Sequence, residues 1–128
     1  MILDSSALLA IALDEPERDA FIAKIDEADC VGVGAPTLVK AGIVLAARTG
    51  TEPGDLLGEL VSVGEAVVIE FGEAHWQEAL AAWWRFGKSR HAANLNFGDC
   101  LAYATARLAA QPLLCKGDDF AKTDLALA

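Results

Sequence analysis

Positive charge is scarce in this chain. Its 128 residues carry 10 lysines and arginines against 19 aspartates and glutamates, which leaves a formal net charge of −9. Such an acidic chain repels a polyanion at long range, so contact with RNA or DNA requires a local basic patch or bound cations. General electrostatic attraction of the whole surface to nucleic acid is therefore excluded.

Cysteine and histidine are also few. Cys30, Cys100 and Cys115 are far apart and form no Cys-x-x-Cys pair, and His75 and His91 share no metal-ligand spacing. Disulfides and a zinc site are therefore not expected. We expect all three cysteines to be buried as small apolar residues in a reducing compartment.

Long uncharged apolar runs are missing as well. No run reaches the ~18 residues that mark a membrane helix, and no basic segment precedes the apolar N-terminus, which Asp4 interrupts. We therefore expect neither a signal peptide nor a membrane span and predict a cytoplasmic protein. With 54% apolar residues, residues 1–128 are expected to fold as a single domain.

Short apolar runs alternate with segments of helical periodicity. Strands are expected at 1–3, 30–35, 66–70 and 113–115, with helices after residues 4, 14–17, 36, 51–53, 73 and 96–99. This alternation predicts a three-layer α/β/α fold around a short parallel sheet. The last of these helices is apolar nearly all round, so it should be central and buried.

Two further segments carry specific expectations about burial. Residues 66–70 have the continuous apolar character of a strand covered on both faces. The helix before them is expected to turn its apolar residues inward. These residues are Leu56, Leu57, Leu60 and Val63.

Carboxylates stand where the expected strands end. Asp4 follows the first strand, Asp118 and Asp119 follow the last, and Asp99 opens the helix that leads into the last strand. Parallel strands bring their carboxyl ends to one edge, and ligands bind outside that edge. Three acids that are far apart in sequence can therefore share one corner.

Such a corner needs a neutralising partner. Two carboxylates ~4 Å apart repel each other by roughly 4 kcal/mol at an effective dielectric of about 20. Mg²⁺ and Mn²⁺ prefer hard oxygen ligands, so carboxylates suit either ion. Helix capping by Asp4 or Ser5, and by Asp99, is the alternative interpretation of the same residues.

Two basic features bear on this corner. The only dense basic cluster is 85–91, with Arg85, Lys88 and Arg90, and it is either loose surface charge or a loop that contacts phosphates. Lys40 is the only charged residue between the helix start at 36 and Arg48, at a place where a cation opposes the helix dipole. A lysine that extends into solvent is the alternative there.

Three tryptophans share one stripe of the helix that begins at residue 73. Trp76, Trp83 and Trp84 are expected to serve the core or a dimer surface rather than to stack on bases.

Three segments resemble one family. Ile-Leu-Asp-Ser-Ser-Ala-Leu at 2–8, Asn-Phe-Gly-Asp-Cys at 96–100 and Leu-Leu-Cys-Lys-Gly-Asp-Asp-Phe at 113–120 are similar to the PIN-domain family, most closely to VapC-type toxins of bacterial toxin–antitoxin pairs. The resemblance runs over essentially the whole chain. It implies a PIN-like fold and an endoribonuclease, dependent on Mg²⁺ or Mn²⁺, that cleaves RNA with metal-activated water and halts translation. It also implies a homodimer that a VapB-type antitoxin neutralises.

The resemblance assigns roles to single residues. Asp4, Asp99 and Asp119 match the first, third and fourth family acids, as catalytic residues and metal ligands, with Asp118 as the alternative to Asp119. Ser6 matches a family hydroxyl that orients a metal-bound water. The basic cluster is then expected to hold RNA phosphates. That cluster comprises Arg85, Lys88 and Arg90.

The chain departs from the family at the second acid. The family has a glutamate on the helix after the second strand, and Lys40 stands at that position. Lysine reverses the charge and places an ammonium where a cation belongs. We expect Lys40 to weaken or abolish metal binding and cleavage.

Two other functions are compatible with these features. A dimer that still captures the antitoxin but no longer cleaves RNA is the first. The second is a receiver-like signalling module, which also has a parallel sheet, an aspartate after the first strand, Mg²⁺ and a late lysine such as Lys116. The expected strand at 66–70 ends without an aspartate to accept phosphate, which counts against a receiver.

Overall fold

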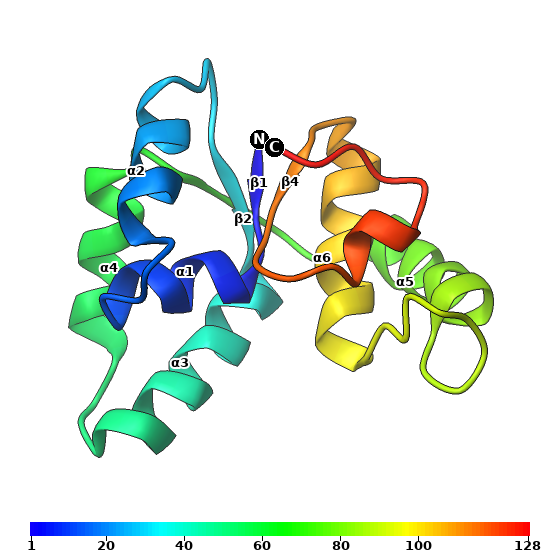
Figure 1. Cartoon of the computed structure of the whole chain (residues 1–128), viewed down its shortest axis with the longest axis horizontal. Coiled ribbons are helices and arrows are strands. Elements are labelled where there is room, and N and C mark those ends of the chain that lie inside the picture. The colour runs from blue at the N-terminus through cyan, green and yellow to red at the C-terminus, as the bar shows by residue number, and fades with distance from the viewer.

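A computed structural model describes all residues 1–128 and contains a parallel four-stranded sheet between two groups of helices (Figure 1). The strand order is β3-β2-β1-β4, and every neighbouring pair is parallel. The predicted three-layer α/β/α fold is therefore confirmed. The strands are β1 (Ile2–Leu3), β2 (Gly32–Gly34), β3 (Val67–Ile69) and β4 (Leu113–Leu114).

Helices cover both faces of the sheet. One group, α1 to α4, lies on one side, and α5 and α6 lie on the other, with the two chain termini side by side at the opposite end from the start of α6 (Figure 1). A short 3-10 turn, η1 (Phe120–Lys122), follows β4. The helices are α1 (Ser5–Ala12), α2 (Arg18–Asp26), α3 (Ala35–Thr49), α4 (Gly54–Val63), α5 (Glu73–Phe86) and α6 (Phe97–Ala109).

The alternation of side chains along the central strands divides the core in two. Ile2 and Leu113, which are paired in register, pack with residues of α5 and α6. Leu3 and Leu114, one position further along, pack with residues of α1, α2 and α3. Because successive strand residues point to opposite faces, two-residue strands suffice to supply both halves of the core.

Helix α6 is central, as its composition predicts. Seven of its residues are buried, among them Tyr103, which has no exposed surface. The end of β2 approaches this helix closely at Gly34, where a Cβ atom would lie 2.8 Å from Thr105 Oγ1. Only glycine therefore allows this close packing of β2 against α6.

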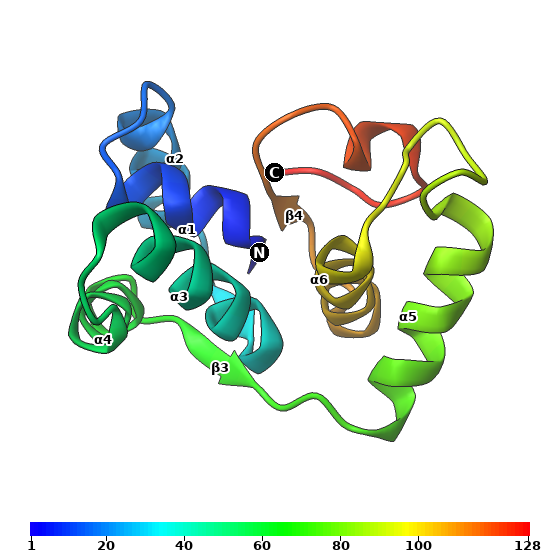
Figure 2. The ribbon, with the colours of Figure 1, turned by 90° about the horizontal axis from the view of Figure 1, so that it is seen from below.

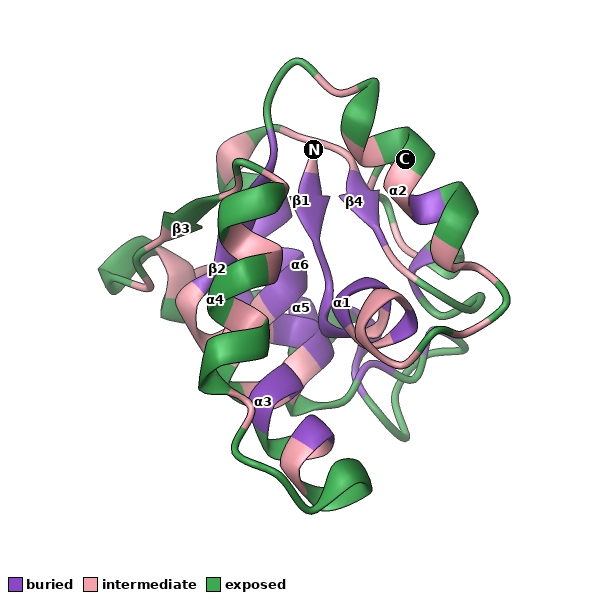
Figure 3. Ribbon diagram, turned by 90° about the vertical axis from the view of Figure 1, so that its left-hand side faces the viewer, coloured by how far each residue is buried: buried purple, intermediate pink, exposed green.

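The burial predicted for 66–70 is wrong, and the burial predicted for the helix before it is correct only in part. Leu57 and Leu60 are partly buried, and Leu57 packs against the core. Strand β3 is the edge of the sheet, and Val67 is 65% exposed, while α4 has no buried residue and leaves Leu56 and Val63 exposed (Figure 3). Figure 2 shows β3 at the periphery, followed by an extended connection to α5. Apolar periodicity identifies residues that share a face, but it does not tell whether another element covers that face.

Helix α2 begins at Arg18, directly after the helix start predicted at 14–17, and its N-cap residue Glu17 makes no side-chain capping bond. Asp14 lies before the helix with a positive φ of 54° and forms an ion pair with Arg18 at 3.5 Å.

The cysteine prediction is correct for one residue and wrong for another. Cys100 is buried, and Cys115 is partly buried; burial, with the nearby Asp99 charge, raises the pKa of the Cys100 thiol to about 11. Cys30 is exposed because it precedes β2 in the turn that follows α2.

No helix combines the length and apolar character needed to cross a bilayer.

Candidate functional site

Strands β1 and β4 end, and α1, α3 and α6 begin, at one edge of the sheet (Figure 1). Residues from these ends line a small polar cavity. Its volume is about 210 Å³. Asp4, Asp99 and Asp119 all line it, whereas Asp118 does not. The topology thus brings together three acids that are far apart in sequence. The remaining lining residues are Ser5, Ser6, Leu9, Lys40, Asn96, Lys116 and Phe120.

Asp4 both caps α1 and faces the cavity. It is 3% exposed, and its Oδ2 accepts hydrogen bonds from the Ser6 N–H at 2.9 Å and the Ser6 hydroxyl at 2.6 Å. The Ser5 hydroxyl donates to Oδ1 at 3.4 Å. The capping and cavity interpretations of Asp4 are therefore compatible.

Asp99 has the same double position at the start of α6. Its Oδ2 accepts the Asn96 N–H at 3.0 Å, and Asn96 Oδ1 accepts the Asp99 N–H at 3.1 Å, which is a reciprocal capping box. Asp99 is 8% exposed. Asn96 was missed as a site residue, although an Asn three positions before an acid at a helix start is a recognisable signal.

Lys40 reaches Asp99 from the second turn of α3. Its Nζ lies 3.1 Å from Asp99 Oδ1. Its methylene groups pack so closely on Gly98 that a Cβ there would lie 2.5 Å from Lys40 Cδ. The ammonium therefore points into the cavity and not into open solvent, and it neutralises the carboxylate that begins α6.

The donor atoms that line the cavity suit a divalent cation, but their arrangement does not. Carboxylate and hydroxyl oxygens are the ligands that Mg²⁺ and Mn²⁺ prefer. However, the structure contains no group of three His, Cys, Asp or Glu side chains close enough to hold a metal ion. The Lys40 ammonium also donates a hydrogen bond to Asp99 Oδ1, an oxygen that a metal ion would need. The residues present, in this arrangement, do not fit a divalent cation.

Ser6 links the segments that follow β1 and β4 at the cavity. While its hydroxyl donates to Asp4, it also accepts the backbone N–H of Lys116 at 2.9 Å. Gly117 follows with a φ of +90°, a left-handed turn that suits glycine and leads back to Asp119 at the rim. Asp119 is the most exposed of the three acids and has Lys122 at 3.9 Å. The hydroxyl of Ser6 is thus committed to protein groups.

Cys115 lies next to this cavity, directly after β4. Burial, together with the negative charges of Asp4 and Asp99, raises the pKa of its thiol to about 11. The thiol is therefore protonated at neutral pH and is a poor nucleophile.

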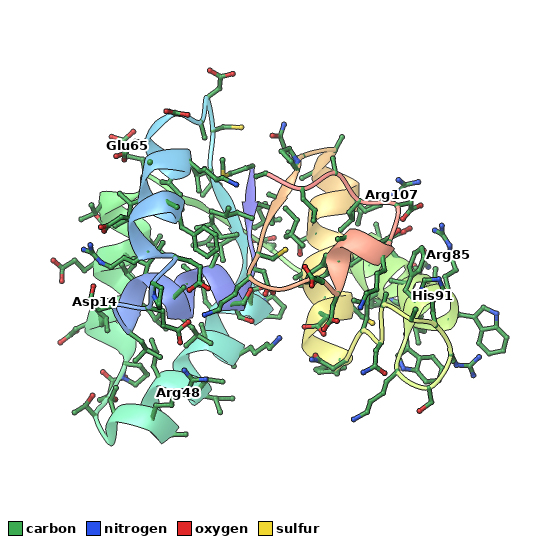
Figure 4. All side chains as sticks on the ribbon, in the orientation of Figure 1. Asp14, Arg48, Glu65, Arg85, His91 and Arg107 are labelled. Carbon is green, nitrogen blue, oxygen red and sulfur yellow. The ribbon has the colours of Figure 1, made fainter.

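The basic cluster lies elsewhere. Arg85 Nη2 binds Asp124 Oδ2 at 2.8 Å, and the Arg90 guanidinium stacks over the rings of Trp83 and Trp84 at 4.3 and 4.1 Å. Arg85 and His91 appear on the α5 side of the molecule in Figure 4. Neither these residues nor the exposed Lys88 line the acidic cavity.

The tryptophans do not serve the core of this chain. Trp76 is 50% exposed and Trp84 67% exposed. Two apolar hollows of about 850 and 510 Å³ adjoin each other here and share Phe97 and Leu101. The larger is formed mainly by α3 and the start of α6, and the smaller by α5 and α6. The prediction that they serve the core is therefore wrong, and a dimer surface stays a prediction.

Comparison with known proteins identifies the family. The sequence profile described as the PIN domain matches residues 1–125. This chain belongs to the PIN-domain family. Over 126 residues the PIN domain is 41% identical to ribonuclease VapC36 of Mycobacterium tuberculosis, covering 98% of this chain and 91% of the relative. It is 38% identical to ribonuclease VapC of Mycolicibacterium smegmatis, covering 98% of both.

Solved structures share the fold of this PIN domain. VapC20 of M. tuberculosis, described as a sarcin-ricin loop cleaving toxin, superposes with a TM-score of 0.79 at 15% identity, over 99% of this chain and 97% of the other. A toxin–antitoxin complex from Klebsiella pneumoniae gives a TM-score of 0.72 at 15% identity, over 99% and 95%. Membership of the PIN family replaces the receiver-like interpretation.

Proposed function

We propose that this PIN domain is a VapC-type toxin whose reaction is the hydrolysis of RNA phosphodiester bonds. The observation that supports this most strongly is the convergence of Asp4, Asp99 and Asp119 on one cavity at the carboxyl edge of the sheet. Relatives with the name ribonuclease VapC, at 38–41% identity over nearly the whole chain, support the same reaction. Inhibition of translation in the cytoplasm is the expected consequence.

The cofactor expected for this reaction is Mg²⁺ or Mn²⁺, and Lys40 opposes it. A divalent ion would have to displace the ammonium from Asp99 Oδ1 and draw three carboxylates together. In this chain the ammonium supplies one positive charge in place of the ion. We therefore propose that the unmodified protein binds metal weakly and cleaves RNA slowly or not at all.

The decisive experiment is an RNA cleavage assay on matched variants. The unmodified chain, Lys40→Glu, and Lys40→Glu combined with Asp4→Asn or Asp99→Asn would be incubated with labelled RNA in Mg²⁺, Mn²⁺ or EDTA. We expect Lys40→Glu to cleave at least tenfold faster than the unmodified chain with Mg²⁺ or Mn²⁺, and each added Asn to remove that gain.

A Lys40→Gln variant is the control that separates two effects of the substitution. It removes the ammonium without adding a carboxylate, so a gain limited to Lys40→Glu assigns the effect to the acid. Absence of cleavage in every variant and with either metal would contradict the ribonuclease proposal.

The partners proposed are RNA, a VapB-type antitoxin and a second copy of this chain. The toxin–antitoxin complex with the same fold supports the antitoxin. The adjoining apolar hollows, with exposed Ile43, Trp76 and Phe97, support a homodimer, because contiguous exposed apolar surface marks an interaction site.

An antitoxin-binding dimer without catalytic activity is the second candidate, and the ion pair of Lys40 with Asp99 favours it. Co-purification of a small basic antitoxin with the unmodified chain, together with no cleavage by that chain, is its expected signature. Rapid Mg²⁺-dependent cleavage by the unmodified chain would exclude it.

A further inference from the structure

Lys116 is fixed at the rim of the acidic cavity through its backbone. It follows β4 and lines the cavity together with Asp4 and Asp119. Its N–H donates to Ser6 Oγ at 2.9 Å, and that hydroxyl donates to Asp4 at 2.6 Å. Two hydrogen bonds therefore connect the backbone of this lysine to the first acid of the site.

The side chain of Lys116 is held by a pair of carboxylates outside the cavity. Its Nζ lies 2.9 Å from Glu15 Oε2 and 2.8 Å from Glu17 Oε2, both in the connection between α1 and α2. Glu15 also binds Arg48 at 3.2 Å, on the α1–α4 side of the molecule, where Figure 4 labels Arg48 and Asp14. Hydrogen bonds to Glu17 and Glu15 raise the pKa of Lys116, so the lysine remains charged.

Few cations can serve an RNA strand at this cavity. A phosphodiester is repelled by three carboxylates and requires a positive group at the rim. Lys40 and Lys116 are the only basic residues that line the cavity. Lys40 forms an ion pair with Asp99, which is itself 8% exposed. Arg85 is bound to Asp124 and Arg90 is stacked on tryptophans, and neither lines the cavity. Lys88 is exposed but does not line the cavity, and Lys122, which also does not line it, lies 3.9 Å from Asp119.

The ion pairs of Lys116 are exchangeable. The lysine side chain is 39% exposed and Glu17 is 38% exposed, and such exposed pairs contribute little to stability. A phosphate oxygen offers the ammonium a charge-assisted hydrogen bond of the same kind as a carboxylate oxygen does. The lysine can therefore change partners without disturbing the fold.

We propose that Lys116 contacts a backbone phosphate of single-stranded RNA at the mouth of the cavity, and that Glu15 and Glu17 retain the lysine while RNA is absent. The inference rests on the proposed ribonuclease function and adds Lys116 as a residue that contacts the RNA substrate. The two glutamates act as competitors of the RNA phosphate, so removing their charge strengthens RNA binding through Lys116.

The test is RNA binding without cleavage. Fluorescence anisotropy with a labelled single-stranded RNA in EDTA, over a series of salt concentrations, would compare the unmodified chain with Lys116→Gln. Losing one phosphate contact on a single strand lowers the slope of log K against log salt by about 0.7. We expect that reduction with Lys116→Gln and none with Arg107→Gln, which makes the same charge change towards the other end of α6.

A second set of variants tests the glutamates. Glu15→Gln with Glu17→Gln should strengthen binding several-fold, and Lys116→Gln in the same chain should abolish that gain. Glu27→Gln with Glu59→Gln is the matched control, because it adds the same charge at residues that form no ion pair in the structure. An equal gain from the control pair overturns the competition with phosphate.

The outcomes separate this inference from the proposed function. Binding of RNA with an unchanged salt slope in Lys116→Gln overturns the role of Lys116 and leaves the ribonuclease proposal in place. Failure of both the unmodified chain and Lys40→Glu to bind any RNA overturns both.

Discussion

At the scale of single residues, the ion pair between Lys40 and Asp99 decides the chemistry of the cavity. The pair is partly covered, with side-chain exposures of 32% and 11%. The closeness of Gly98 to the lysine stem directs the ammonium towards Asp99. Lys40 thus places a positive charge beside one of the oxygen donors that would suit a metal ion, and we expect it to weaken metal binding.

Metal binding can be measured apart from activity. In EDTA we expect Lys40→Glu to lose about 1–3 kcal/mol of stability, because the ion pair is replaced by carboxylate repulsion. Added Mg²⁺ should restore the melting temperature of this variant and leave that of the unmodified chain unchanged, since a ligand stabilises only the folded state that binds it. Differential scanning fluorimetry checks this, with Lys40→Gln as the control; an equal Mg²⁺ response in the unmodified chain would show that Lys40 does not exclude the ion.

The thiols provide a second residue-scale prediction. Cys30 is exposed, whereas burial raises the pKa of Cys100 and of Cys115 to about 11. We expect one thiol to react rapidly with Ellman's reagent in the native protein and the others to react only on unfolding. Replacing Cys30 by Ser should remove the rapid phase, and its persistence would mean that a buried thiol is accessible.

At the scale of elements, α6 connects the site, the sheet and the C-terminal segment of the chain. Its first turn carries Asp99, its middle packs on β2, and Tyr103 anchors the C-terminal segment by donating to Asp124 Oδ1 at 2.6 Å. Arg85 of α5 binds the other oxygen of Asp124. The last residues of the chain are thereby fastened to the helix layer that positions the site.

The Tyr103 anchor predicts an alkaline sensitivity. Burial, then the hydrogen bond to Asp124, raises the tyrosine pKa from 10.0 to about 12. A pKa raised in the folded state means that the stabilisation is complete below pH 10 and is lost as the pH rises towards 12. Urea unfolding at several pH values should show this decline in the unmodified chain and a shallower one in Tyr103→Phe. That variant should also be about 1 kcal/mol less stable at neutral pH; identical alkaline slopes would contradict the assignment.

The close contact between β2 and α6 predicts a steric effect. Gly34→Ala places a methyl group 2.8 Å from Thr105 Oγ1, and overpacking of this kind costs about 1–3 kcal/mol. Thr105→Ala should relieve much of that loss in the double variant, because it removes the obstructing atom. Chemical denaturation of the four proteins gives the coupling energy, and simple additivity would argue against a direct clash.

At the scale of the whole molecule, polar and apolar functions occupy different surfaces. The acidic cavity lies at the edge of the sheet, and the apolar hollows lie over α3, α5 and the start of α6. Lys40 lines both the cavity and the larger hollow, and Gly98, which packs on Lys40, lines the larger hollow. A partner seated in the hollows would therefore adjoin the site without covering the strand ends.

Assembly can be tested with one charge on each of two exposed surfaces. Ile43→Glu places a carboxylate in the larger hollow, where the side chain is 66% exposed, and should shift a dimer to monomer. Val63 on α4 is 77% exposed and lies outside both hollows, so Val63→Glu should leave assembly unchanged. Light scattering after size-exclusion chromatography measures both, and a monomeric unmodified chain would refute the proposed homodimer.

The sequence by itself determined the order of the elements and the end of the sheet at which the acids gather. Alternating strands and helices admit few topologies, and in parallel sheets the carboxyl ends meet at one edge. Asp4, Asp99 and the pair Asp118 and Asp119 could therefore be predicted as site residues before any coordinates were known, and the resemblance to the PIN-domain family favoured Asp119 over Asp118. The reversal of charge at Lys40 was equally visible, although its geometric effect was not.

Only the tertiary structure decided which groups touch. Lys40 and Asp99 are 59 residues apart, and their contact depends on how α3 packs against Gly98 at the start of α6. The basic cluster lies away from the acids because Asp124 and two tryptophans bind its arginines. Periodicity and spacing describe one segment at a time, whereas contacts between distant segments follow from packing, which no local pattern encodes.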